Sequence, residues 1–129
     1  MCQELGIESP AVPRIATPFG GGIAGMGSVC GAVVGAVMAI GLKRGREEPE
    51  HARPHAYAPA QEVYRRFQEE MGSVICRELT GIDLSTLEGL KRLYSSDVPQ
   101  RVCLPAVATG YRLALAVLRE AEEGSAPAG

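Results

Sequence analysis

Residues 23–42 read IAGMGSVCGAVVGAVMAIGL, and this uncharged stretch decides the fold that we expect. It is rich in Gly, Ala and Val, and Lys43 and Arg44 follow it with the positive charge that a helix C-terminus favours. We predict a helix over Ile23–Leu42, which would be long enough to span a bilayer. Its many glycines lower its hydrophobicity, and the other helices need an apolar surface to cover. We therefore expect the buried central helix of a compact soluble bundle, with no membrane span.

Small residues recur every four positions along this predicted helix, at Gly27, Gly31, Gly35 and Ala39. Residues four apart lie on one side of a helix, and small side chains there let a second backbone approach closely. The ridge predicts tight packing inside the bundle. The alternative is a non-catalytic assembly module, a homodimer through Gly27, Gly31 and Gly35 in which the cysteines are only structural.

A second helix is predicted over Ala60–Leu79. Val63, Phe67 and Met71 recur there at helical spacing and form its apolar face. Gly81 is placed to end this helix, because glycine readily adopts the left-handed conformation of a C-terminal cap.

The segment Glu47–Pro59 is rich in Glu, Pro and His, so we interpret it as an exposed linker. His51 and His55 could be taken for a metal-binding pair one helical turn apart. Pro54 lies between them and disfavours a helix, so we interpret both histidines as solvated.

The last helix is predicted over Val98–Glu122. Its expected apolar stripe consists of Leu104, Val107, Tyr111, Leu115 and Leu118. A capping box from Ser85 to Glu88 predicts a short helix that ends at Leu93. Met1–Phe19 contains three prolines and leaves room for at most two short helical pieces. No segment alternates with a period of two, so the predicted fold class is all-α.

The composition fits one domain, since 129 residues with a net charge of −2 can bury a single core. We assign residues 1–123 to a single helical, cysteine-containing domain and residues 124–129 to a disordered tail. No basic stripe is interleaved with aromatic residues, which argues against nucleic acid as the main partner. The N-terminus lacks a basic region followed by an apolar run, so we expect a cytoplasmic location. There, four cysteines favour reactivity or metal binding over structural disulfides.

Residues 20–25 read GGGIAG and match the GxGxxG pattern of dinucleotide-binding proteins. That pattern requires a preceding strand, but Pro13 and Pro18 lie just before it here, and no later strand is predicted. We interpret the three glycines as a hinge ahead of the central helix.

Cys30 lies near the start of the predicted central helix, just after Ser28, a suitable N-cap. Unpaired N–H groups and the positive helix end stabilise a thiolate at such a position, which favours reactivity or metal binding. The alternative interpretation, a small buried apolar residue, is equally compatible with the sequence.

Cys76 and Cys103 fall on the other two long predicted helices, so each long helix supplies one cysteine. Taken alone, either cysteine would be interpreted as a residue of the hydrophobic core. Together with Cys30, however, three converging helices can bring three thiols to one point, as iron–sulfur clusters and soft metals require. No local CxxC pattern is present, so the fold itself must assemble the site.

Several motifs in this chain together resemble one known family. Phe19-Gly20-Gly21-Gly22 is followed by the CGAxxG motif Cys30-Gly31-Ala32-Val33-Val34-Gly35, and then by Cys76-Arg77-Glu78-Leu79 and Cys103. Their order across Leu5–Leu118 resembles the C_GCAxxG_C_C family of redox-active proteins, which has four signature cysteines.

The resemblance implies that Cys30, Cys76 and Cys103 bind an iron–sulfur cluster or another metal, or exchange thiols and disulfides, in electron transfer with a donor or acceptor protein. The resemblance does not imply a substrate, so it is compatible with both an electron-transfer protein and an oxidoreductase. The first cysteine of the family belongs to a longer lead helix. Cys2 lies too close to Gly6 to occupy that position, so a fourth ligand would be Cys2 or a group from outside the chain.

Overall fold

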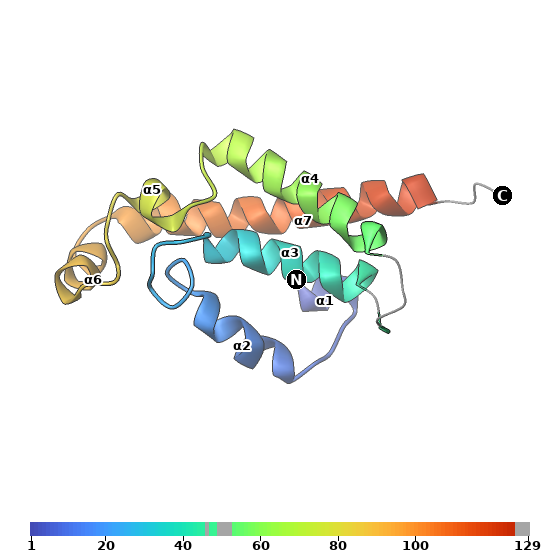
Figure 1. The fold of residues 1–129 in the computed structure, drawn as a ribbon, viewed down its shortest axis with the longest axis horizontal. Coiled ribbons are helices and arrows are strands. Elements are labelled where there is room, and N and C mark those ends of the chain that lie inside the picture. The colour runs from blue at the N-terminus through green and yellow to red at the C-terminus, as the bar shows by residue number, and fades with distance from the viewer. Residues whose placement is uncertain (46, 49–52, 126–129) are drawn as a thin grey trace.

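The protein is all-helical in a computed structural model that describes residues 1–45, 47–48 and 53–125. Within these residues there are seven α-helices, and extended pairing is limited to one isolated bridge, so the predicted fold class is confirmed. Three long helices, α3 (Gly31–Arg44), α4 (Pro54–Met71) and α7 (Leu104–Ser125), lie side by side (Figure 1). The shorter elements are α1 (Cys2–Leu5), α2 (Ala11–Ala16), the 3-10 turn η1 (Thr17–Phe19), α5 (Cys76–Thr80), α6 (Leu87–Tyr94) and the π-turn η2 (Pro99–Cys103).

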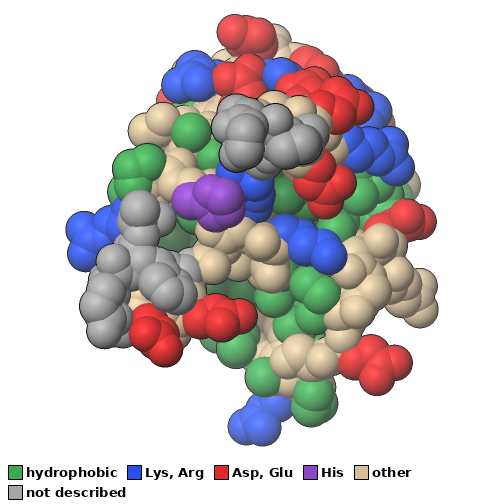
Figure 2. Space-filling model, turned by 90° about the vertical axis from the view of Figure 1, so that its right-hand side faces the viewer, with side chains coloured by type: hydrophobic (Ala, Val, Ile, Leu, Met, Phe, Trp, Pro, Cys, Tyr) green, Lys and Arg blue, Asp and Glu red, His purple; other side chains and the backbone are tan. Residues whose placement is uncertain are grey.

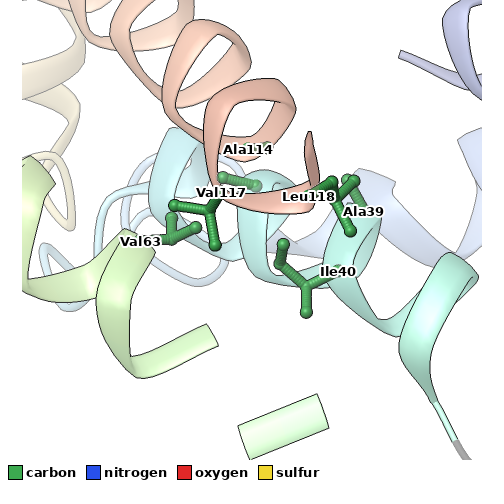
Figure 3. Close-up of a cluster of buried hydrophobic side chains, with 7 residues drawn as sticks. Ala39, Ile40, Val63, Ala114, Val117 and Leu118 are labelled. Carbon is green, nitrogen blue, oxygen red and sulfur yellow. The ribbon is translucent and has the colours of Figure 1, made fainter. Parts of the chain in front are cut away.

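The core lies where the three long helices meet. Figure 3 shows Ile40 of α3, Val63 of α4 and Val117 of α7 pointing toward one another, and all three are buried. Gly110 allows this close packing, because a Cβ atom there would lie 2.8 Å from the carbonyl oxygen of Ala32 on α3. A small residue at the crossing thus sets the distance between α3 and α7.

The central helix begins later than predicted, at Gly31, because the chain before it is left-handed. Positive φ angles run from Gly21 through Gly25, including 67° at Ile23 and 51° at Ala24. The amides of Ile23 and Ala24 donate to the carbonyls of Phe19 and Pro18, at 3.2 and 2.7 Å, which holds this unusual backbone in place. We call residues 20–28 the glycine loop.

The glycine loop corrects two predictions about small residues and caps. Cys30, with φ −55° and ψ 133°, takes the N-cap position that was predicted for Ser28. Gly27 has a φ of 73° and lies in the loop, so it does not continue the ridge of Gly31 and Gly35. A Cβ atom on Gly31 would approach the Phe19 carbonyl oxygen at 3.1 Å, whereas Gly35 faces open space.

The second predicted helix is displaced toward the N-terminus. Helix α4 begins at Pro54 and ends at Gly72, whose φ is 87°, so Pro54–Pro59 is helical and is no linker. Proline is tolerated in the first turn of a helix, because the N–H that it lacks has no partner there. His55 is exposed on α4, and its carbonyl accepts a hydrogen bond from Nε of Arg44 at 3.0 Å. His51 lies outside the described residues.

The last helix has the predicted extent but a different buried face. Leu104 and Val107, expected in the core, are 63% and 57% exposed. Leu118 of the predicted stripe is buried as expected, and the rest of the buried face consists of Ala106, Gly110, Leu113, Ala114 and Val117. Half of these residues are alanine or glycine, and Gly110 lies where α7 approaches α3 closely. The helix continues to Ser125, so the predicted tail starts too early, and residues 126–129 lie outside the described part of the chain.

By length and composition, the continuous helix Pro99–Gly124 could also cross a membrane. In this fold α3 and α4 both pack against it, and Ala114 and Leu113 on it are buried. It therefore serves here as the helix around which the core is built.

Ion pairs join α4 to α7 at the surface. Arg66 of α4 contacts Glu120 of α7 at 2.6 Å and Glu62 of its own helix at 2.8 Å. Figure 2 shows the end of the molecule where both helices lie, with acidic and basic side chains intermixed and apolar patches between them. Both signs of charge therefore occur together on this face.

Candidate functional site: a cavity lined by three thiols

A short antiparallel pairing positions two of the cysteines. Val29 and Ile75 form an isolated bridge, and the amides on either side of it bond across the pair. Cys30 N–H donates to the Val74 carbonyl at 2.7 Å, and Cys76 N–H donates to the Ser28 carbonyl at 2.7 Å. Successive residues of extended chain point to opposite faces, so Cys30 and Cys76, each one residue after the bridge, share a face.

The pairing also sets how far apart the two thiols stand. Cys30 is opposite Val74, which makes Cys76 its diagonal neighbour. Diagonal neighbours are typically about 7–8 Å apart, with their Cβ atoms somewhat closer. Disulfides usually join Cα atoms roughly 4.4–6.8 Å apart. A disulfide between Cys30 and Cys76 would therefore require the two segments to move closer together.

Cys30 caps helix α3, where it meets the positive end of fourteen aligned peptide units. Its carbonyl accepts hydrogen bonds from the amides of Val33 and Val34 at 3.0 and 3.2 Å. Within the described chain, the amides of Gly31 and Ala32 have no hydrogen-bond partner, as expected for the first turn of a helix. The thiol of Cys30 thus stands at a helix end that attracts negative charge.

Cys76 is the most buried of the four cysteines, with 7% of its surface exposed, and it begins helix α5. The glycine loop packs directly on it, because a Cβ atom on Gly22 would lie only 2.6 Å from the Cys76 Cβ. Burial raises the pKa of the Cys76 thiol, and the neighbouring Cys30 and Cys103 raise it further. This thiol therefore stays protonated above the pH at which an ordinary cysteine ionises.

Cys103 is half-buried at the end of the π-turn η2, directly before α7. Burial raises the pKa of its thiol, and proximity to Cys30 adds to the effect. Val102 and Cys103 pack against the cluster that contains Cys76 and Leu84. The π-turn, which is rare and frequent at functional sites, positions this third thiol.

All three cysteines line one cavity of about 390 Å³. Glycines 20–22, Phe19 and the aliphatic side chains of Leu79, Leu84 and Leu93 form part of its wall. The sequence identified the thiols and the glycines, but it gave no sign of Leu84 or Leu93, because only the fold brings these residues to the wall. The described lining residues include no charged side chain.

Cys2 lies apart from this group, on helix α1. Its neighbour Met1 lines a second cavity of about 340 Å³. That cavity borders the first and shares Gly31, Ala32 and Val107 with it. The structure therefore brings three of the four candidate cysteines to one cavity. The fourth, Cys2, follows Met1, which lines the adjoining cavity.

The three thiols are not arranged to hold a metal ion as they stand. Across residues 1–45, 47–48 and 53–125, no group of three His, Cys, Asp or Glu side chains has a geometry that could bind one.

Together these features define a class: an all-helical protein with three thiols on the wall of one apolar cavity. The chain matches the family described as "Putative redox-active protein (C_GCAxxG_C_C)" over residues 1–117, and it belongs to that family. It is also similar to an uncharacterised protein from Archaeoglobus fulgidus, with 29% identity over 116 residues, 83% of this chain and 70% of that protein. No solved structure matches it.

Proposed function

We propose that this protein carries electrons by cycling Cys30 and Cys76 between two thiols and a disulfide, with Cys103 as a third thiol at the same cavity. The observation that carries the proposal is the bridge between Val29 and Ile75, which puts Cys30 and Cys76 on one face. Membership of a family described as redox-active supports it.

The two thiols differ in environment, and this difference assigns their roles. Cys30 is half-buried at the start of α3, whereas Cys76 is buried, so Cys30 is the thiol that an oxidant reaches first. Cys76 has a raised pKa because it is buried, so it stays protonated while Cys30 forms a bond to the oxidant. Cys76 then loses its proton and its sulfur attacks the Cys30 sulfur, so that the S–S bond forms as the bond between Cys30 and the oxidant breaks and the electron pair leaves with the oxidant. The pair gives up two electrons and two protons per cycle.

Disulfide mapping tests the proposal. The anaerobically reduced protein is treated with diamide, digested and analysed by mass spectrometry, and a Cys30–Cys76 disulfide is the expected product. Cys30→Ser should abolish this product, whereas the matched Cys2→Ser variant should leave it unchanged. Thiols that resist both diamide and alkylation in the folded protein would refute the proposal.

An iron–sulfur cluster is the second candidate, because three thiols line one cavity. Iron and acid-labile sulfide assays on anaerobically purified protein distinguish the two. Stoichiometric iron that is lost in the Cys30→Ser and Cys103→Ser variants would favour the cluster over the disulfide.

A further inference from the structure

The cavity beside the thiols has the character of a binding site for a small uncharged molecule. Its volume of about 390 Å³ falls within the usual range for ligand pockets, which is roughly 300–1,000 Å³. The described wall carries no charged side chain, so a charged ligand would lose its hydration without gaining an ion pair.

The two hydroxyl groups in the wall are already occupied. Thr17 Oγ1 donates to the Pro13 carbonyl at 2.5 Å, and Thr80 Oγ1 donates to the Cys76 carbonyl at 2.9 Å. Among the described wall residues, hydrogen-bond donation to a ligand is therefore left to the backbone amides and the thiols. The amides of Gly31 and Ala32 belong to wall residues and have no hydrogen-bond partner in the described part of the chain. Such amides at a helix start suit a carbonyl oxygen, or the negative charge that develops on it.

We propose that this cavity binds the ring of an uncharged quinone, which accepts the electrons of the Cys30–Cys76 dithiol. Apolar walls enclose the ring, the α3 amides receive a ring oxygen, and the thiols stand beside both. This inference rests on the proposed function and adds the chemical class of the acceptor.

The chemistry balances without another reactant. The Cys30 thiolate adds to the ring, and the sulfur of Cys76 then attacks the Cys30 sulfur. The S–S bond forms as the bond between sulfur and ring breaks, and the electron pair stays on the ring. The two protons lost by the thiols convert the reduced ring to a hydroquinone.

The test compares an uncharged quinone with a charged disulfide. Reduced protein is mixed under argon with duroquinone or with glutathione disulfide, and each rate of thiol loss is divided by the rate for dithiothreitol under the same conditions. We expect a normalised rate at least ten times higher with duroquinone, with one hydroquinone formed per disulfide.

Two positions on α7 provide a matched pair of variants. Val107 and Leu104 are both exposed, but only Val107 lines the cavity. Val107→Glu brings a carboxylate to the wall and should slow oxidation by duroquinone at least tenfold. Leu104→Glu should change it less than twofold. Circular dichroism verifies that both variants fold, and the comparison of oxidants in the unaltered protein does not depend on them.

The outcomes separate this inference from the proposed function. Equal normalised rates with the two oxidants, or a Val107→Glu rate equal to that of Leu104→Glu, would overturn the quinone proposal while diamide still yields the Cys30–Cys76 disulfide. If diamide also yields no such disulfide, the proposed function itself fails.

Discussion

The absence of a side chain at Gly22 keeps Cys76 in place. A Cβ atom at this position would lie 2.6 Å from the Cys76 Cβ and 2.7 Å from the Ser28 amide nitrogen, and the φ of 70° is one that other residues rarely adopt. The contact with Ser28 matters as well, because the carbonyl of that residue accepts the Cys76 amide hydrogen bond. Gly22 therefore determines both the space around the thiol and the pairing that orients it.

We predict that Gly22→Ala destabilises the protein by about 2–4 kcal/mol. This is the free-energy cost of an alanine in the left-handed conformation added to the cost of an overpacked contact. It should also speed the alkylation of Cys76 by iodoacetamide, because the loop must move away from the thiol. Urea unfolding and mass spectrometry of the alkylated peptides measure the two effects.

Gly35→Ala is the control for this prediction. Gly35 lies on α3 with open space where a Cβ would be, so alanine should stabilise the helix by roughly 0.5–1 kcal/mol. Equal effects of the two substitutions would show that the glycine loop does not hold Cys76.

At the scale of single elements, helix α6 begins at an N-cap one residue later than the predicted capping box, which started at Ser85. Thr86 is the N-cap, and its Oγ1 accepts the Gly89 amide hydrogen bond at 3.0 Å. Ser85 precedes it and donates its hydroxyl to Asp83 instead. The cap begins the helix that carries Leu93 to the cavity wall.

We predict that Thr86→Ala costs about 0.5–2 kcal/mol of unfolding free energy, the usual range for the loss of an N-cap. Ser85→Ala, at the residue that the sequence favoured, should cost less than about 0.5 kcal/mol, as is usual for a surface position. Urea titration of both variants measures the difference. A larger loss for Ser85→Ala would contradict the assignment of the cap.

The elements also show what the sequence could and could not predict. The hydrophobic periodicity and the amino-acid composition were sufficient to predict the fold class and a long last helix. The start of α3 was wrong because the left-handed run includes Ile23 and Ala24, residues that rarely adopt a positive φ. The predicted end of α4 was wrong because Gly72, with a φ of 87°, ends the helix, although Val74 continues the apolar period beyond it. Both errors lie beside a cysteine.

The cavity itself could be predicted only in part. The motifs drew attention to Cys30, Cys76 and Cys103, and the structure places all three on one wall. The bridge between Val29 and Ile75 joins segments that lie far apart in the chain, and pairing of that kind leaves no local pattern. The redox roles of the three thiols remain a prediction.

At the scale of the whole molecule, the ion pair between Arg66 and Glu120 links α4 to α7, two of the three helices that enclose the core. Hydrogen bonds from Arg66 lower the pKa of Glu120, and those from Arg65 and Arg66 lower the pKa of Glu62. A carboxylate whose pKa is lower in the folded state adds stability above its unfolded pKa. That stability is lost as the pH falls through the folded pKa. The affected window therefore lies below the ordinary value of 4.5.

We predict that Arg66→Ala lowers the urea midpoint at pH 7 in dilute buffer and weakens the loss of stability below pH 4.5. High salt should shrink the effect at pH 7, since the groups involved are exposed and screened. Arg65→Ala is the matched control and should shift the midpoint less, because among the described residues the ion pair of Arg65 is with Glu62 of its own helix. If both variants gave the same midpoint and the same acid profile, the pair between Arg66 and Glu120 would add nothing to the contact between α4 and α7. That contact would then rest on the apolar packing of Val63 with Val117 and on the second ion pair, between Arg112 of α7 and Glu70 of α4.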